Sequence, residues 1–321
     1  MRRAVNKVSN EIFDAFLICS YKSFLLTSGL KGEKSDYIEL ISRLDNEYGV
    51  AASNRLAITA GQGLAASILK CQFQELRAGD EIFFNVCVTV EGLNSQIGAV
   101  KRVEGLSQIG AFHYIPVIFC RNVRIGKIQK LWLAYRALVL GQAQGRIPDN
   151  GVIIYGPKFR HTKIRLTSHV ETITRHIDSL SQQNDGKVKA ALFLNRNCNT
   201  CQFKKYCRKE AEEADHISLL SGISEKEVTR YNNKGIFTVN QLSFTYRPRR
   251  RKKRDGKHQP LEYALRALAL REQRTYIKEL PPILPSETEI YLDFEGLPDE
   301  RFIYQIGMVI KEENLENTVT F

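Results

Sequence analysis

Three cysteines near the middle of the chain have the spacing of metal ligands. Cys198, Cys201 and Cys207 form a C-x2-C-x5-C run. In a loop that leads into a short helix, thiolates at this spacing can converge on one face of an iron–sulfur cluster or on a zinc ion. A complete site needs a fourth ligand, and the best candidate is Cys19, far upstream. The sequence therefore predicts a four-cysteine metal centre.

The remaining cysteines give a different signal. Cys71, Cys87 and Cys120 occur singly in apolar segments, which predicts ordinary buried thiols. The total of seven is odd, and in a long chain this favours a reducing cytoplasm over a disulfide framework. Reactive thiols crowded in a basic loop would be prone to oxidation without a metal, so the 198–207 run is not expected to be free.

A pair of carboxylates near the end of the chain could also hold metal. Asp293 and Glu295 lie on a predicted strand at 289–296, and strand alternation places both on one face. Two-metal phosphodiester hydrolysis needs such bridging carboxylates for Mg²⁺ or Mn²⁺. The segment 302–310 predicts the second strand of the same hairpin. Two acids alone are an incomplete catalytic set.

The region between these motifs has features of a nucleic-acid contact. Segments 217–228 and 234–242 predict a helix-hairpin-helix unit, in which Gly222 allows a tight turn and amides near Ser224 can receive a phosphate oxygen. The alternative is a helical packing module without a ligand. A basic run follows, which predicts contact with a nucleic-acid backbone or, alternatively, a solvated linker. Its members are Arg247, Arg249, Arg250, Arg251, Lys252, Lys253 and Arg254.

Composition agrees with a polyanionic partner. The 321 residues carry a net charge of +12, with a pI of about 9.3, which favours nucleic acid first and anionic membrane second. The length allows about two domains. No apolar run approaches the ~20 residues of a membrane span, and no secretory signal is evident, so we expect a cytoplasmic protein without membrane contact.

Helical and strand periodicity alternate over the first two hundred residues. This pattern predicts an α/β or α+β core over about 1–210, with one mixed sheet. The predicted helices are 8–26, 35–48, 128–140 and 169–182, and the predicted strands are 82–90, 97–103, 112–119 and 152–155, the last extended or paired by 163–166.

Together these motifs resemble the RecB-like nuclease family. The resemblance is carried by Cys-x-Tyr-Lys-x-Phe-Leu from Cys19, the three-cysteine run, the Leu-x-Gly-Ile hairpin, the basic run and Tyr-Leu-Asp-Phe-Glu-Gly at 291–296. It implies a [4Fe–4S] cluster on Cys19, Cys198, Cys201 and Cys207, and DNA rather than RNA as partner.

The resemblance also implies a domain order. A restriction-endonuclease-like PD-(D/E)XK domain, a mixed sheet with flanking helices, would occupy 1–210. A helix-hairpin-helix module would follow at 211–245, then a basic linker and helix at 246–285. The first strands of a truncated ribonuclease H-like exonuclease domain would occupy 286–321.

The chain departs from the family at both catalytic sites. Gly98 stands where the family carries a metal-binding aspartate, and no acid occurs between Glu104 and Asp149 to supply the acid-x-lysine pair. The nearby Glu91 and Glu104 are predicted turn residues. Asp293 and Glu295 match only the first two acids of a four-acid set.

We therefore expect a nucleic-acid-binding iron–sulfur protein with weak or absent nuclease activity. One alternative is metal-dependent DNA hydrolysis through an unconventional ligand set. The others are a DNA-binding module without chemistry and a non-functional fragment of a longer nuclease. The sequence does not identify any protein partner.

Overall fold

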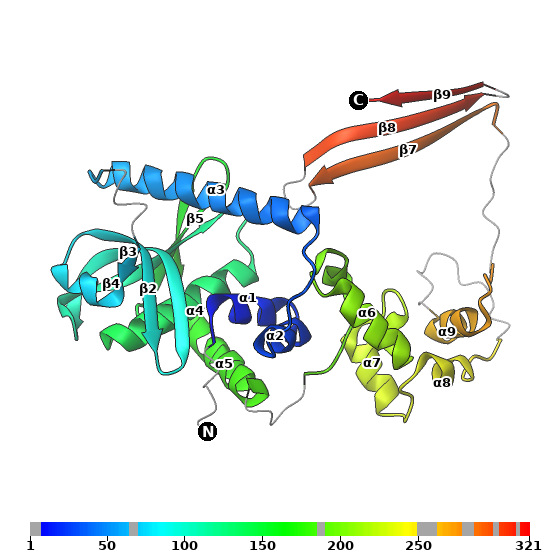
Figure 1. Ribbon diagram of the computed structural model, residues 1–321, viewed down its shortest axis with the longest axis horizontal. Coiled ribbons are helices and arrows are strands. Elements are labelled where there is room, and N and C mark those ends of the chain that lie inside the picture. Colours follow the sequence, from blue (N-terminus) through cyan, green and yellow to red (C-terminus); the bar gives the residue numbers. More distant parts are fainter. Residues whose placement is uncertain are drawn as a thin grey trace. The chain divides into compact units, whose positions relative to one another are not determined.

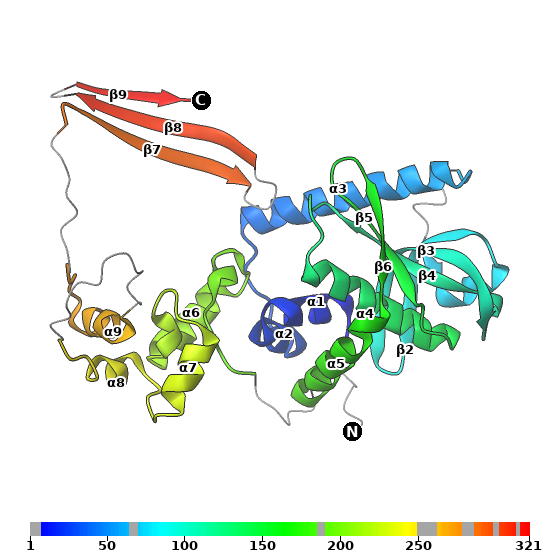
Figure 2. The same cartoon turned by 180° about the vertical axis from the view of Figure 1, so that it is seen from behind.

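The computed structural model has a mixed α/β architecture in two compact units, Met1–Arg274 and Thr275–Phe321. Figures 1 and 2 show the elements from opposite sides. The structure describes residues 8–63, 70–184, 190–248, 262–277, 286–297, 302–312 and 315–321. The predicted segments 1–210 and 211–245 both belong to the first unit.

The first unit is built on a six-stranded mixed sheet in the order β1-β2-β3-β4-β5-β6. The pairs β1/β2 and β4/β5 are parallel, and the other neighbours are antiparallel. This confirms the predicted α+β class with one helix-flanked mixed sheet. The strands are β1 (Cys71–Gln72), β2 (Ile82–Val90), β3 (Leu93–Ser107), β4 (Gly110–Cys120), β5 (Asn150–Tyr155) and β6 (Arg160–Arg165).

The buried side chains of β2 alternate regularly along the strand, but they do not all pack on the same face of the sheet. Ile82 and Phe84 pack in the cluster that includes α3, whereas Val86 and Val88 pack in the cluster on the α4 side. Asn85, which lies between them, has a φ of 49° and turns the strand's inward face from one side to the other. One run of alternating residues therefore contributes to both cores.

Helices cover both faces of this sheet (Figure 1). One side carries α1 (Asn10–Ile18), α4 (Lys127–Gln144) and α5 (Val170–Asn184), and the other carries α3 (Asp36–Thr59). The predicted helix at 35–48 is thus too short. No proline follows Tyr48, and Ala52 and Ala57 are buried against the sheet, so packing extends the helix past the end of its clear periodicity.

A small helical module completes the first unit. Its core contains Ile217, Leu220, Val228, Leu242 and Tyr263, among others. The two helices of the predicted hairpin are present as separate elements before a third helix. The module's elements are η5 (Ile217–Leu219), α7 (Glu225–Asn232), α8 (Val239–Ser243) and α9 (Tyr263–Glu272).

The second unit is a three-stranded antiparallel sheet in the order β7-β8-β9. The predicted hairpin of β7 (Thr288–Leu297) and β8 (Phe302–Glu312) is present, and β9 (Leu315–Thr320) adds a strand that the sequence did not predict. Ile290, Leu292 and Phe294 alternate onto one face, opposite Ile310, Met308 and Ile306. These three β7 side chains are exposed.

Within the described residues, none of the helices combines the length and apolarity that a membrane crossing demands.

Candidate metal centre

Cys19 lies at a break between two helices. The predicted continuous helix at 8–26 is wrong, because Cys19 is extended (φ −160°, ψ 113°) between α1 and α2 (Ser20–Thr27). Its sulfur caps α2 by accepting the Lys22 N–H at 3.4 Å. Burial raises the pKa of the Cys19 thiol, and the amides of Lys22 and Tyr21 lower it. The break thus orients a sulfur that already accepts backbone hydrogen bonds.

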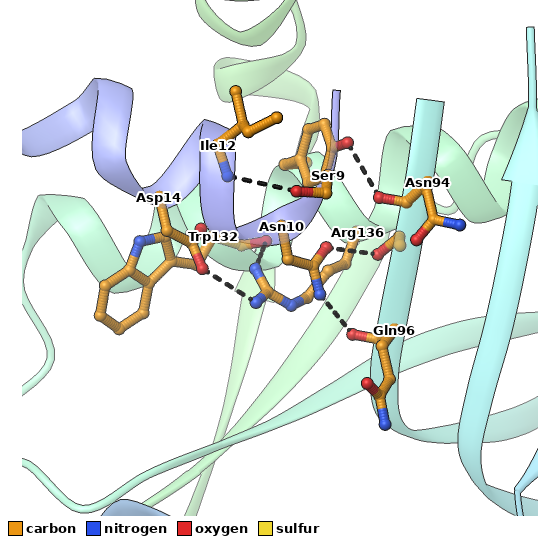
Figure 3. Close-up of polar contacts among 10 residues, drawn as sticks. Ser9, Asn10, Ile12, Asp14, Asn94, Gln96, Trp132 and Arg136 are labelled. Atoms are coloured by element: carbon orange, nitrogen blue, oxygen red, sulfur yellow. Dashed lines mark hydrogen bonds and ion pairs between the residues drawn. The ribbon is translucent and has the colours of Figure 1, made fainter. Parts of the chain in front are cut away.

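Polar contacts hold α1, and with it Cys19, against the core (Figure 3). The side-chain amide of Asn10 donates to the carbonyl of Gln96 at 2.7 Å. Arg136 of α4 donates to Asp14 at 3.2 Å, and both are largely shielded from water. Burial raises the pKa of Asp14, while Arg136 lowers it. This ion pair fixes the position of the helix that ends at Cys19.

The other three cysteines occupy the turn before α6 and its first turns. Cys198 lies in η4 (Arg196–Thr200), Cys201 caps the end of that turn, and Cys207 lies in α6 (Lys204–Glu213). The Asn195 N–H donates to the Cys198 sulfur at 3.3 Å. Two of the four sulfurs therefore accept amide hydrogen bonds, as sulfurs of iron–sulfur and zinc sites do.

The fold brings the four predicted ligands together. Burial first, and then the neighbouring Cys201, Cys19 and Cys198, raise the pKa of Cys207 to about 12. The pKa of Cys19 rises through burial first and also through Cys198 and Cys201. That of Cys198 rises through burial first and also through Cys201. Each of the six cysteine pairs thus interacts electrostatically, although Cys19 is remote in sequence.

An apolar shell packs against three of these cysteines, Cys19, Cys201 and Cys207. Tyr21, Leu25, Ala190 and Phe203 are buried together with Cys207. Such a shell limits access of water and oxidants to the sulfurs. Burial also raises the pKa of Cys19 and of Cys207, since an apolar environment disfavours a thiolate.

Further contacts join the loop after α2 to the cysteine-bearing segment. Tyr21 donates its hydroxyl to the carboxylate of Glu210. The Glu33 N–H donates to the Gln202 carbonyl at 2.8 Å, and Lys205 pairs with the Glu33 carboxylate at 2.6 Å. These contacts therefore join residues 21–33 to residues 202–210 beside the cysteine group, although most of the sheet domain lies between them in the sequence.

The thiol chemistry of the donor set suits a thiophilic metal, but within the described residues these sulfurs are not gathered at metal-binding distances. Burial and the neighbouring sulfurs raise the pKa of Cys19, Cys198 and Cys207, which favours their protonated thiols, whereas a metal cation deprotonates its ligands outright. Four cysteine sulfurs are the donors of both zinc and iron–sulfur sites. Among the described residues, no three His, Cys, Asp or Glu side chains are grouped closely enough to hold a single metal ion.

The remaining cysteines lie elsewhere in the core. Cys71 and Cys120 are buried, as predicted, and Cys87 is half-buried. Burial raises the pKa of Cys71 to about 11 and that of Cys120 to about 12. These environments are those of packing thiols.

Position 98, where the resemblance predicts a lost metal-binding aspartate, has no space for a side chain. A Cβ built on Gly98 would lie 2.7 Å from a ring carbon of Phe119. The β4 partner of this region is apolar and carries no acid. Glu91 lies in a turn, as predicted, but Glu104 is within β3 and pairs with Phe112, so the prediction of a turn there is wrong.

Asp293 and Glu295 lie on one face of β7, as strand alternation requires, opposite Gly307 and Gln305. Both carboxylates are exposed. The Asp293 carboxylate accepts the N–H of Phe294. In the second unit, therefore, the two acids share the more polar face of the sheet, away from its aliphatic face.

The hairpin has the turn geometry that its glycine predicts. Gly222 has a φ of 79°, which favours glycine. Ser224 begins α7 in a capping box, where its hydroxyl accepts the Glu227 N–H and the Glu227 carboxylate accepts the Ser224 N–H. A phosphate at this helix end would have to displace the Glu227 carboxylate.

The basic run is placed only at its first residue. Arg247 is exposed and donates to the carbonyls of Phe244 and Tyr246. The other predicted contact residues, Arg249, Arg250, Arg251, Lys252, Lys253 and Arg254, lie outside the described residues.

Sequence reasoning missed the contacts that hold the centre together. The Asp14–Arg136 pair and the Tyr21–Glu210 hydrogen bond join residues that are more than a hundred positions apart. The available signal was weak: an acid on α1 and a tyrosine on α2, the two helices that flank Cys19.

Comparison with known proteins leaves the family resemblance as a prediction: no protein-family model matches this chain, and no curated protein matches it.

Proposed function

We propose that the protein binds nucleic acid and that its four-cysteine centre holds a [4Fe–4S] cluster, which ties the N-terminal helices to the segment of η4 and α6. The observation that carries this proposal is the mutual interaction of Cys19 with Cys198, Cys201 and Cys207. The ligands come from the two ends of the sheet-domain sequence, so the complete centre exists only in the folded chain. Metal binding is therefore expected to stabilise the fold.

A cluster accounts for this ligand set better than zinc. Structural zinc sites usually take their ligands in local pairs, whereas Cys19 is alone in its segment. Amide hydrogen bonds to the sulfurs and an apolar shell are the features by which proteins adjust the reduction potential of iron–sulfur clusters. When bound, the cluster supplies a rigid cross-link and a redox-sensitive group. The four cysteines and their shell hold it.

The nucleic-acid partner is proposed from charge and from the helical module. The net charge of +12 favours a polyanion, and the hairpin that contains Gly222 precedes the basic run. DNA is the preferred partner on the family resemblance. The restriction-endonuclease-like fold of the first unit and the ribonuclease H-like identity of the second are part of the same proposal.

Little hydrolytic activity is expected from the first unit. The ring of Phe119 occupies the space that a metal-binding side chain at position 98 would need. A second candidate function is Mg²⁺- or Mn²⁺-dependent hydrolysis at Asp293 and Glu295, which the shared face of these acids favours. Two carboxylates do not by themselves position two ions, so this activity is expected to be weak or absent. The alternative is a binding module without hydrolytic activity.

The metal is tested on protein purified without oxygen. We expect brown protein that contains iron and acid-labile sulfide, with both lost in Cys201→Ser. The matched control is Cys87→Ser, which removes a half-buried thiol away from the centre and should leave the iron content unchanged. Colourless protein with one stoichiometric zinc would reject the cluster.

Binding is tested with labelled single- and double-stranded DNA at several salt concentrations. Replacing Arg249, Arg250, Arg251 and Lys252 with alanine should weaken binding to all sequences alike and flatten its salt dependence, because phosphate contacts carry no base information. Unchanged affinity at low salt would make the basic run a solvated linker.

Cleavage is measured with Mg²⁺ or Mn²⁺ on the same substrates. Activity that survives Asp293→Ala together with Glu295→Ala would show that the site lies elsewhere.

A further inference from the structure

The positive charge of the chain is concentrated in its folded core as well as in the basic run. Residues 105–170 contain ten lysines and arginines but a single carboxylate, that of Asp149. This stretch includes the loop before α4 and the β5–β6 hairpin. A segment with so one-sided a charge favours a positive local field where acids of other segments do not lie close.

The loop between β4 and α4 and the first turn of α4 carry three of these cations. Arg124, Lys127 and Lys130 lie there, and the first turn contains no acid. Arg124 and Lys127 are exposed, and Lys130 is half-buried. Cations are disfavoured at a helix N-terminus, because the helix dipole already places positive charge there. Folding alone therefore does not account for the two lysines.

The β5–β6 turn lies against one side of this loop. A Cβ built on Gly156 would lie 3.8 Å from the carbonyl oxygen of Asn122 and from Cα of Val123. The Gly156 N–H donates to the carbonyl of Cys120. Arg160, just after this turn, lies over the ring of Tyr155, which packs against the core cluster on the α4 side.

The segment that leads into α5, and α5 itself, also lie near the α4 lysines. Burial lowers the pKa of His169, and Lys130 and Lys127 lower it further. Burial also lowers the pKa of His176, with Lys127 and Arg175 adding to the effect. Both histidines therefore lie within the positive field of the lysines, and His176 packs edge-on against Phe16.

These cations have no carboxylate partners in the described part of the chain. Arg121 pairs with Asp45 and Arg175 pairs with Glu171, so nearby cations do form ion pairs where an acid is available. For the α4 cations, the described residues include no ion pair. We name this group the α4 basic surface. Its members are Arg124, Lys127, Lys130 and Arg160.

We propose that the α4 basic surface is a phosphate-binding surface that contacts the backbone of a nucleic acid, separately from the hairpin and the basic run. This inference rests on the proposed nucleic-acid binding and adds a second contact site to it. Unpaired, mostly exposed cations on a rigid helix end and an adjoining β-turn match repeated phosphates.

An anionic membrane fits this surface less well. The exposed apolar side chains beside the cations are Val123 and Ile128, with 42% and 38% exposure. Membrane-surface helices present a broad apolar face, whereas α4 is buried in the core from Leu131 onward along most of its length. The helix has no free apolar face to insert.

The test compares two charge-reversed variants of the full chain. Lys127→Glu with Lys130→Glu removes two proposed phosphate contacts. Lys31→Glu with Lys34→Glu is the matched control, since it changes the net charge equally at two exposed lysines in the loop before α3. Affinity for labelled single- and double-stranded oligonucleotides is measured against salt concentration.

Each phosphate contact on B-DNA contributes about 0.9 to the salt slope, so two contacts are worth roughly 60-fold in affinity at 0.1 M salt. We expect a loss of that order for the α4 variant and a slope smaller by about two units. The control should lose only a few-fold. Because acids are favoured at a helix N-terminus, the α4 variant should melt at an equal or higher temperature than wild type, which separates lost binding from lost folding.

The outcomes are distinct. If wild type binds oligonucleotides and the two variants lose affinity equally, the surface is not a contact site, while nucleic-acid binding stands. If wild type binds no oligonucleotide at low salt, the proposed nucleic-acid binding is itself rejected, and the inference built on it is rejected with it. If the α4 variant keeps its oligonucleotide affinity but no longer sediments with phosphatidylserine vesicles, the surface serves a membrane and the inference is overturned.

Discussion

Gly32→Ala tests whether the clamp around the cysteine group is as tight as the structure indicates. A Cβ on Gly32 would lie 2.6 Å from the carbonyl oxygen of Gln202 and 2.8 Å from its carbonyl carbon. An ordinary contact begins at 3.4 Å, so the backbone beside Cys201 must retreat by about 0.8 Å. Metal–ligand distances tolerate about 0.2 Å, so the displacement is several times what the centre can absorb.

The energetic cost has two parts. Overpacking costs about 1–3 kcal/mol, and retreat of Gln202 weakens its hydrogen bond with the Glu33 N–H, worth about 1 kcal/mol. Replacing glycine with alanine lowers the conformational entropy of the unfolded chain, which stabilises the folded state by about 0.4–1 kcal/mol. The net destabilisation is about 2 kcal/mol, which corresponds to a fall in melting temperature of roughly 4–8 °C for a unit of this size.

The assay is iron content and the rate at which a chelator removes the metal from anaerobic protein, followed by absorbance. Gly32→Ala should hold less iron and lose it faster. The control is Gly49→Ala in α3, where no atom lies within 4 Å of the added methyl group and alanine favours the helix. If Gly32→Ala retains full iron, the same loss rate and the same melting temperature, the proposed clamp is wrong.

Three further predictions follow from the same packing. Gly98→Asp should lower the melting temperature without creating Mg²⁺-dependent cleavage, because the Phe119 ring fills the space; any gain in cleavage would contradict this. Tyr21→Phe should cost about 1 kcal/mol in thermal or denaturant unfolding, since Glu210 loses the donated hydroxyl; an unchanged midpoint would count against the contact. In metal-free protein, alkylation of Cys207 should still be rising between pH 9 and 11, because burial first and the neighbouring thiols second raise its pKa to about 12; a plateau near pH 9, seen by mass spectrometry, would refute this.

Much of the sheet could be predicted from the sequence. The predicted strand at 82–90 matches β2 (Ile82–Val90) because alternation is strong there. The change of side at Asn85 could not be predicted, since it depends on one positive φ that only the three-dimensional packing requires. The end of α3 was missed for a related reason, because burial of Ala52 and Ala57 against the sheet is a tertiary effect.

The candidate centre was predictable in its ligands but not in its support. Cysteine spacing indicated Cys198, Cys201 and Cys207, and the resemblance supported Cys19. The contact between Gly32 and Gln202 has no sequence signal, because any small loop residue would look the same. The α4 basic surface was also missed, since its cations are spread over a loop, a helix and a hairpin that only the fold brings near one another.

Cys19 has a structural role as a helix cap and a proposed role as a metal ligand, and a substitution can separate the two. Its backbone ends one helix and its sulfur caps the next, while the same sulfur interacts electrostatically with the other three cysteines. Serine and aspartate are better caps than cysteine but poor partners for iron. A chain with Cys19→Ser could therefore fold its first two helices as well as before and yet bind no metal. Such a variant would separate the stability that belongs to the polypeptide from the stability that belongs to the cofactor.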